Sequence, residues 1–119
     1  MRSRLPGRGH NRLMAEPIDL KHFEAATFGD RALQDEVLAL FEAQAEKLLH
    51  VIRNSEGKAR MEAAHALKGA ASGIGAFAVA DEAQKIERDG SGSADALASR
   101  IAEVQNAAAA LRARVQAPR

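Results

Sequence analysis

The spacing of apolar residues near the C-terminus is the feature that most restricts what this chain can fold into. Six apolar side chains follow one another at intervals of three or four residues: Leu97, Ile101, Val104, Ala108, Leu111 and Val115. Because an α-helix has 3.6 residues per turn, this spacing puts them on one helical face. Such a face must be buried against another surface. The pattern therefore predicts a packed helical domain.

Composition indicates that the rest of the chain is helical as well. Aromatic residues make up only 3% of the 119 residues, whereas strands favour aromatic and β-branched side chains. Ala and Leu, which the chain uses freely, favour helices. The absence of cysteine excludes disulfides, thiolate metal sites and a cysteine nucleophile. This composition predicts an all-α protein. No apolar run approaches the ~20 residues that span a bilayer, and the apolar core of a secretory signal is missing. We therefore expect a soluble, cytoplasmic protein without a membrane partner.

Glycine, asparagine and serine residues divide the chain from residue 17 onward into five expected helices. The first is short, with Asp19 as its N-cap and Gly29 as its stop. Asp30 is the expected cap of the second helix and Ser93 that of the last. The expected bounds are about 17–30, 31–53, 58–74, 76–88 and 94 onward. Four long amphipathic helices joined by short turns indicate an antiparallel four-helix bundle, and the short N-terminal helix would close one end.

Apolar stripes in the middle helices support this architecture. The stripe of the second helix consists of Leu33, Val37, Leu40, Phe41, Ala45, Leu48 and Ile52. The third helix has Ala64, Leu67, Ala71 and Ile74, and the fourth has Val79, Ala83 and Ile86. A lone coiled coil is the alternative for the last helix, but its alanine content and its single seam favour bundle packing.

Residues 1–16 differ from the rest of the chain. They hold four arginines against Glu16 alone, include proline and glycine, and show no helical period. We therefore expect a disordered basic tail ahead of one domain over residues 17–116. An arm that binds nucleic acid is the alternative, but no aromatic residues lie between the arginines, so we expect no nucleic-acid partner. In a third interpretation Met14 is the natural start.

The stretch AAHALKGAASGIGA, residues 63–76, holds the candidate functional residues. Beside the core stripe of this helix runs a second stripe of His65, Lys68, Gly69 and Ser72, which should lie on the accessible rim of the bundle. A neutral imidazole is a nucleophile near pH 7, and Lys68 can neutralise phosphoryl oxygens. Gly69 leaves a gap through which the backbone of a partner protein can approach the histidine.

Each of these residues also has an ordinary interpretation. A lone histidine on a helix is usually a surface residue, and we assign that status to the other three, His10, His22 and His50. Lys68 alone could be a solvated charge, and Gly69 alone a helix-packing contact. We expect no metal site, because MEAAH is not the HExxH zinc pattern and neither position four residues from His65 is a histidine or a carboxylate.

The longer stretch AHALKGAASGIGAFAVADEAQKIE resembles the signature of the histidine-containing phosphotransfer (HPt) domains of multistep phosphorelays. His65 falls on the phosphorylated histidine of that pattern, Lys68 and Gly69 on its lysine and glycine, and Ile86-Glu87 on its closing pair. The stretch IDLKHFEAATFGDRALQDEVLALFEAQAEKLL is similar to the first two helices of the family, so the resemblance covers about residues 18–115. Alanines after the glycine, where many members have serines, and Val79 in place of leucine are the departures.

The resemblance implies a helical bundle with His65 as the exposed phosphoacceptor. It implies that the imidazole Nε2 attacks the aspartyl phosphate of a response-regulator receiver domain. The histidine later passes the phosphoryl group to another receiver. The partners include the receiver domains of hybrid histidine kinases. Such a carrier has no kinase activity and no cofactor of its own, since Mg²⁺ belongs to the receiver; the chain also lacks a GxxxxGK[ST] phosphate loop. We expect a monomer. The surface expected to dock receivers comprises Glu62, Ala66, Gly69, Ser72 and Gln84, with Arg60 beside them.

Two alternatives belong to other classes of protein. A helical adaptor bundle would bind a partner without any phosphate, but it has no need for Lys68 and Gly69 beside His65. The phosphoacceptor domain of a dimeric histidine kinase would carry an H-E-[LI]-[RK]-x-P motif, which this chain lacks. Acid-labile, base-stable phosphate on the protein after mixing with a phosphorylated receiver separates the phosphocarrier from the adaptor.

Overall fold

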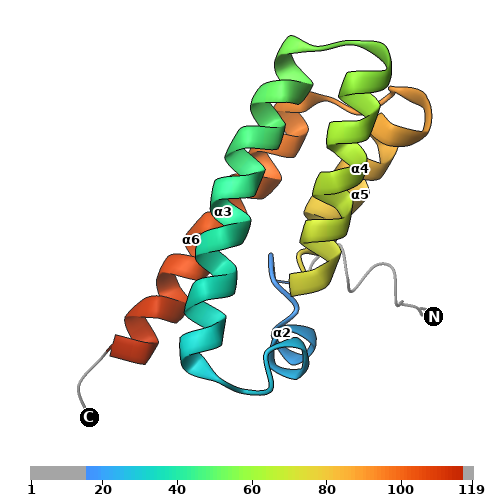
Figure 1. Cartoon of the computed structure of the whole chain (residues 1–119). Helices are drawn as coiled ribbons and strands as arrows, with labels where there is room; N and C mark the ends of the chain where they lie inside the picture. The colour runs from blue at the N-terminus through green and yellow to red at the C-terminus, as the bar shows by residue number, and fades with distance from the viewer. Residues whose placement is uncertain (1–15, 117–119) are drawn as a thin grey trace, which may run out of the picture.

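The computed structural model describes residues 16–116 (Figure 1). The expected tail before Glu16 lies outside the described residues, as does the side chain of Val115. The described residues form five helices: α2 (Leu20–Ala26), α3 (Arg31–Asn54), α4 (Gly57–Ile74), α5 (Phe77–Asp89) and α6 (Ala94–Gln116). Residues 16–116 contain no strand, and the all-α prediction is confirmed.

Three of the described helices, α2, α3 and α6, begin directly after the predicted capping residues. Asp19 accepts a hydrogen bond from the backbone N–H of His22 at 3.1 Å, and Asp30 accepts one from the N–H of Leu33 at 3.0 Å. Ser93 Oγ likewise accepts from a backbone N–H in the first turn of α6, at 3.1 Å. Each cap satisfies a donor that the helix itself leaves without a partner. Where both ends were predicted, the bounds of the long helices are within one residue of the observed ones.

The turn between α2 and α3 is held more tightly than its sequence indicates. α2 ends at Ala26, ahead of the predicted stop at Gly29, and the buried hydroxyl of the next residue, Thr27, donates to the carbonyl of Phe23 at 2.7 Å. Thr27 Oγ1 also accepts from the amide of Gln34 at 3.1 Å. The next residue, Phe28, has φ +56° and is 86% exposed. This is an uncommon backbone conformation for a bulky side chain.

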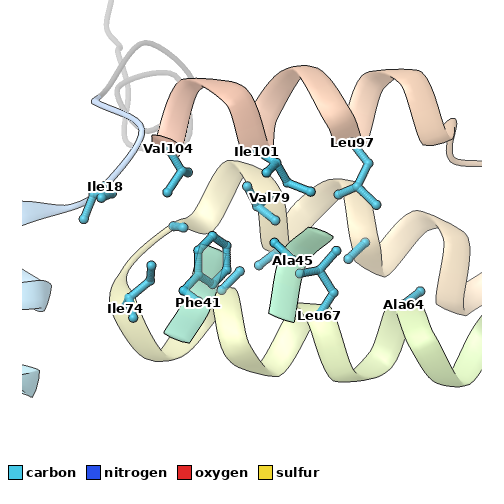
Figure 2. Packing of buried hydrophobic residues seen from close by; sticks show 14 of the residues in the cluster. Ile18, Phe41, Ala45, Ala64, Leu67, Ile74, Val79, Leu97, Ile101 and Val104 are labelled. Carbon is cyan, nitrogen blue, oxygen red and sulfur yellow. The ribbon is translucent and has the colours of Figure 1, made fainter. Parts of the chain in front are cut away.

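The four long helices share one hydrophobic core. α4 packs against α3 and α5, α6 packs against the same two helices, and α2 contacts α4. In Figure 1, α3 and α6 lie side by side, as do α4 and α5. Figure 2 shows the buried cluster between them. Several of its members are alanines without exposed surface: Ala45, Ala64, Ala71, Ala83 and Ala108. Small side chains let the helices approach closely, which explains how a chain with so few aromatic residues fills its core.

The core stripes of α4 and α5 are confirmed, but the stripe assigned to α3 is partly wrong. Leu40 was expected in the core and is 62% exposed, whereas Leu38 was not expected there and is 2% exposed. Neighbouring residues point about 100° apart around a helix, so Leu40 and Phe41 cannot both face the core centre. The face that is buried contains Leu38, Phe41, Ala45 and Ile52.

No helix within residues 16–116 has both the length and the apolar character needed to cross a bilayer.

Candidate functional site

His65 lies on the rim of the bundle, as its position on α4 predicts. Its neighbours in the sequence, Ala64 and Leu67, have no exposed surface and face the core. The side chain of His65 is 67% exposed and that of Lys68 is 32% exposed. The helix therefore turns its small and apolar residues inward and presents the imidazole to solvent.

A carboxylate from α5 joins the two residues. Glu87 Oε2 lies 2.6 Å from His65 Nδ1, and Glu87 Oε1 lies 2.9 Å from Lys68 Nζ. The two helices pack side by side, which brings together residues that are 22 positions apart in the chain. His65 and Lys68, three residues apart on α4, share one face and reach the same carboxylate. From the sequence, Glu87 was expected only to match the end of the HPt signature.

The Glu87 carboxylate is held in its ionised form. The nearby Lys68 ammonium, and after it the His65 imidazole, lower the pKa of Glu87 below its ordinary value of 4.5. Oε1 is shielded from solvent and no described side chain gives it an aligned hydrogen bond. The 2.9 Å approach of the Lys68 ammonium to this oxygen is therefore an attraction between charges.

This carboxylate determines which nitrogen of His65 is available for reaction. An ionised carboxylate only accepts hydrogen bonds, so Nδ1, 2.6 Å from Glu87 Oε2, must carry the proton. In the neutral imidazole Nε2 then has the free lone pair. The contact also fixes the orientation of the ring, because a second anchoring point restricts its rotation. The site thus presents a nucleophilic nitrogen on an exposed, oriented imidazole.

Four of the residues expected to dock a partner lie on α4 near His65. Gly69 and Ala66 are exposed, and Ser72 is half-buried. A Cβ atom added at Gly69 would meet no other heavy atom within 4 Å, so the gap beside the imidazole is open. Glu62 is exposed and pairs with Lys58 at 3.7 Å. These four predicted residues therefore surround His65 on its own helix.

Gln84 and Arg60 are placed differently. Gln84 is exposed on α5, one turn before Glu87, and lines a hollow between α5 and α6 that does not include His65. Arg60 donates a hydrogen bond to the carbonyl of Ile52 at 2.6 Å, and this contact satisfies an acceptor at the end of α3. Arg60 is thus engaged in holding two helices together.

A second hollow, of about 590 Å³, lies directly beside His65. Its lining consists of Lys58, Met61, Glu62, His65 and Glu87. Met61 was not among the residues expected at the site, although it precedes His65 by one helical turn and is 44% exposed. The described residues include no group of three or more histidine and acidic side chains arranged to hold a metal ion.

Comparison with known protein families matches the chain to one of them, whereas no curated protein and no solved structure matches it. The model of the Hpt domain matches residues 36–114. The match includes α4 and α5, which supply His65, Lys68 and Glu87, and it begins later than the resemblance noted from residue 18. Hpt domains take part in histidine phosphotransfer in phosphorelays, interact with receiver domains and have in general no kinase activity of their own. The chain belongs to the Hpt domain family.

Proposed function

We propose that this protein is a phosphoryl carrier that accepts a phosphoryl group on His65 from the aspartyl phosphate of one receiver domain and passes it to another. In the first step the bond from phosphorus to the imidazole Nε2 forms while the bond to the aspartate oxygen breaks, and the aspartate leaves as a carboxylate. The second step reverses these events on another receiver. Neither step consumes ATP, and the Mg²⁺ that assists them belongs to the receiver.

The observation that supports this role is the 2.6 Å contact between His65 Nδ1 and Glu87 Oε2. As Nε2 attacks phosphorus, positive charge develops on the ring and is shared with the Nδ1–H group. The carboxylate of Glu87 stabilises that charge, as the aspartate does for the histidine of a catalytic triad. It also keeps the ring in the tautomer that reacts.

Lys68 has two tasks in this proposal. In the resting protein its ammonium lies 2.9 Å from Glu87 Oε1 and helps to keep that carboxylate ionised and in place. During transfer the flexible side chain turns toward the incoming phosphoryl oxygens and neutralises part of their charge. The side chain is 32% exposed, which leaves it access to a group arriving from solvent.

The proposal extends to the domain bounds, the oligomeric state, the location and the partners of the protein. We place the functional unit at residues 17–116, an antiparallel four-helix bundle with a short additional helix, preceded by a basic tail. The protein acts as a monomer in the cytoplasm and binds receiver domains, not nucleic acid. The exposed strip of Ala66 and Gly69 and the half-buried Ser72 form part of the surface that receivers cover.

The test is phosphoryl transfer from a phosphorylated receiver to the purified protein. The wild type should acquire acid-labile, base-stable phosphate, and His65→Gln should acquire none while keeping its helical circular dichroism. Because the side chain of His65 is 67% exposed, the substitution should leave the fold intact. Uptake that persists in His65→Gln would overturn the assignment, and a wild type that takes no phosphate from any receiver of its source would favour the helical adaptor.

A further inference from the structure

The hollow beside His65 has one apolar residue and several charged ones, and the charged residues pair with one another. Lys58 and Glu62 form an ion pair at 3.7 Å on α4. Glu87 is engaged by His65 at 2.6 Å and by Lys68 at 2.9 Å. No charge that the structure describes in this lining is left to attract an ion. The surface of the hollow that still lacks a contact partner is the apolar side chain of Met61, a residue that is 44% exposed.

The position of Met61 puts it under any protein that reacts with His65. The two residues are four positions apart on one face of α4, about 6 Å along the helix axis. Transfer requires the reacting atoms to approach within about 3.5 Å, so the receiver must cover the imidazole. Even a weak, transient interface buries on the order of 600 Å² of each partner, a patch of roughly 14 Å radius. Such a patch centred on His65 includes Met61.

From this geometry we propose that the hollow of Lys58, Met61, Glu62, His65 and Glu87 is a docking pocket for an apolar side chain of the receiver domain. The proposal rests on the proposed function. Met61 is the apolar contact, and the Lys58–Glu62 pair forms a rim whose charges cancel, so that a neutral side chain enters at little electrostatic cost. Methionine suits this task because its flexible thioether adapts to differently shaped partners. The receiver thus contacts α4 on both sides of His65: at the open strip of Ala66, Gly69 and Ser72 that follows it, and at this pocket, whose Met61 precedes it.

The chain offers a matched control for this pocket. Leu40 is an exposed apolar residue on α3 that lies outside the hollow, and it is 62% exposed. Met61→Glu and Leu40→Glu therefore introduce the same charge at comparable surface positions of the two helices. Both should fold, since neither side chain belongs to the core. Met61→Leu keeps an apolar side chain of similar volume at this position and should transfer phosphate like the wild type.

The experiment measures the rate of transfer from a phosphorylated receiver as the receiver concentration is varied, with phosphoramidate as a second donor that needs no docking surface. Met61→Glu should raise the half-saturating receiver concentration by about tenfold or more, while the rate at saturation changes little. Phosphate uptake from the receiver should fall further than uptake from phosphoramidate. Leu40→Glu should behave as the wild type. Equal rates for Met61→Glu and Leu40→Glu beside an active wild type would overturn the docking pocket and leave the proposed function standing. A wild type that accepts phosphate from neither donor would overturn both.

Discussion

Gly69 gives a prediction in which stability and function change in opposite directions. A Cβ atom at this position would have no heavy atom within 4 Å beyond its own helix, and the residue is exposed in the interior of α4. Gly69→Ala should therefore gain the helix propensity of alanine without strain, which is about 0.5 to 1 kcal/mol. For a domain of this size that gain raises Tm by roughly 2 to 8 °C. Thermal unfolding followed by circular dichroism measures it.

A longer side chain at the same position should impair transfer. Gly69→Gln keeps the fold for the same reason, but it fills space about 6 Å along the helix axis from His65, which the receiver must enter. Transfer from a phosphorylated receiver should fall, and by more than Lys68→Ala causes, while uptake from phosphoramidate should persist. Gly73→Gln is the comparison variant, and it should impair transfer less than Gly69→Gln does. Gly73 is also exposed in α4 with no neighbour within 4 Å of an added Cβ, but it lies about 12 Å along the axis from His65.

Three outcomes would refute this reasoning. If Gly69→Gln slows both donors equally, the glycine shapes the geometry of the histidine itself. If the variant unfolds, the open space beside Gly69 is not available to a side chain. If Gly73→Gln slows receiver transfer as much as Gly69→Gln does, the gap next to His65 has no special importance for docking.

The remaining predictions concern Lys68, Glu87 and Phe28. Lys68→Ala should slow transfer by about 10- to 10³-fold without stopping it, because one positive group near the phosphoryl charge is lost; an unchanged rate would make Lys68 a solvated charge. The folded protein lowers the pKa of Glu87 below 4.5, so its contribution to stability is present above that pH and is lost as the pH falls through the lowered value. Below pH 4.5, urea unfolding should therefore show a steeper loss of stability for the wild type than for Glu87→Gln, and parallel curves would contradict the contact. Phe28→Gly should raise stability by about 1 kcal/mol, since φ is +56° and the exposed ring contributes little; a loss of stability would show that the ring is held by contacts.

The helices were predictable because their ends are encoded locally. Asp19, Asp30 and Ser93 act as caps within three residues of the donors they satisfy, and Gly75 ends α4 with φ +84°. Such signals need no knowledge of the tertiary structure. The α2–α3 turn was harder to predict, because its geometry depends on the buried Thr27 hydroxyl.

The candidate site was predictable only as far as one helix determines it. His65 and Lys68 follow from the face of α4, since spacings of three and four residues define that face. Glu87 was missed because its contact depends on the register between α4 and α5, and periodicity in either helix leaves that register open. The error at Leu40 has a similar origin: the stripe on α3 was wide enough to fit more than one rotation of the helix, and packing chose the face with Leu38.

We expect Nε2 of His65 to carry the phosphoryl group, because Glu87 engages Nδ1 at 2.6 Å. The most direct measurement is NMR of the protein labelled with ¹⁵N in its histidines, recorded before and after transfer from a phosphorylated receiver. Before transfer, the His65 ring should show a proton on Nδ1 and none on Nε2. After transfer, phosphorus coupling should appear on Nε2 of His65. Coupling on Nδ1, or phosphate on any other residue, would contradict the account.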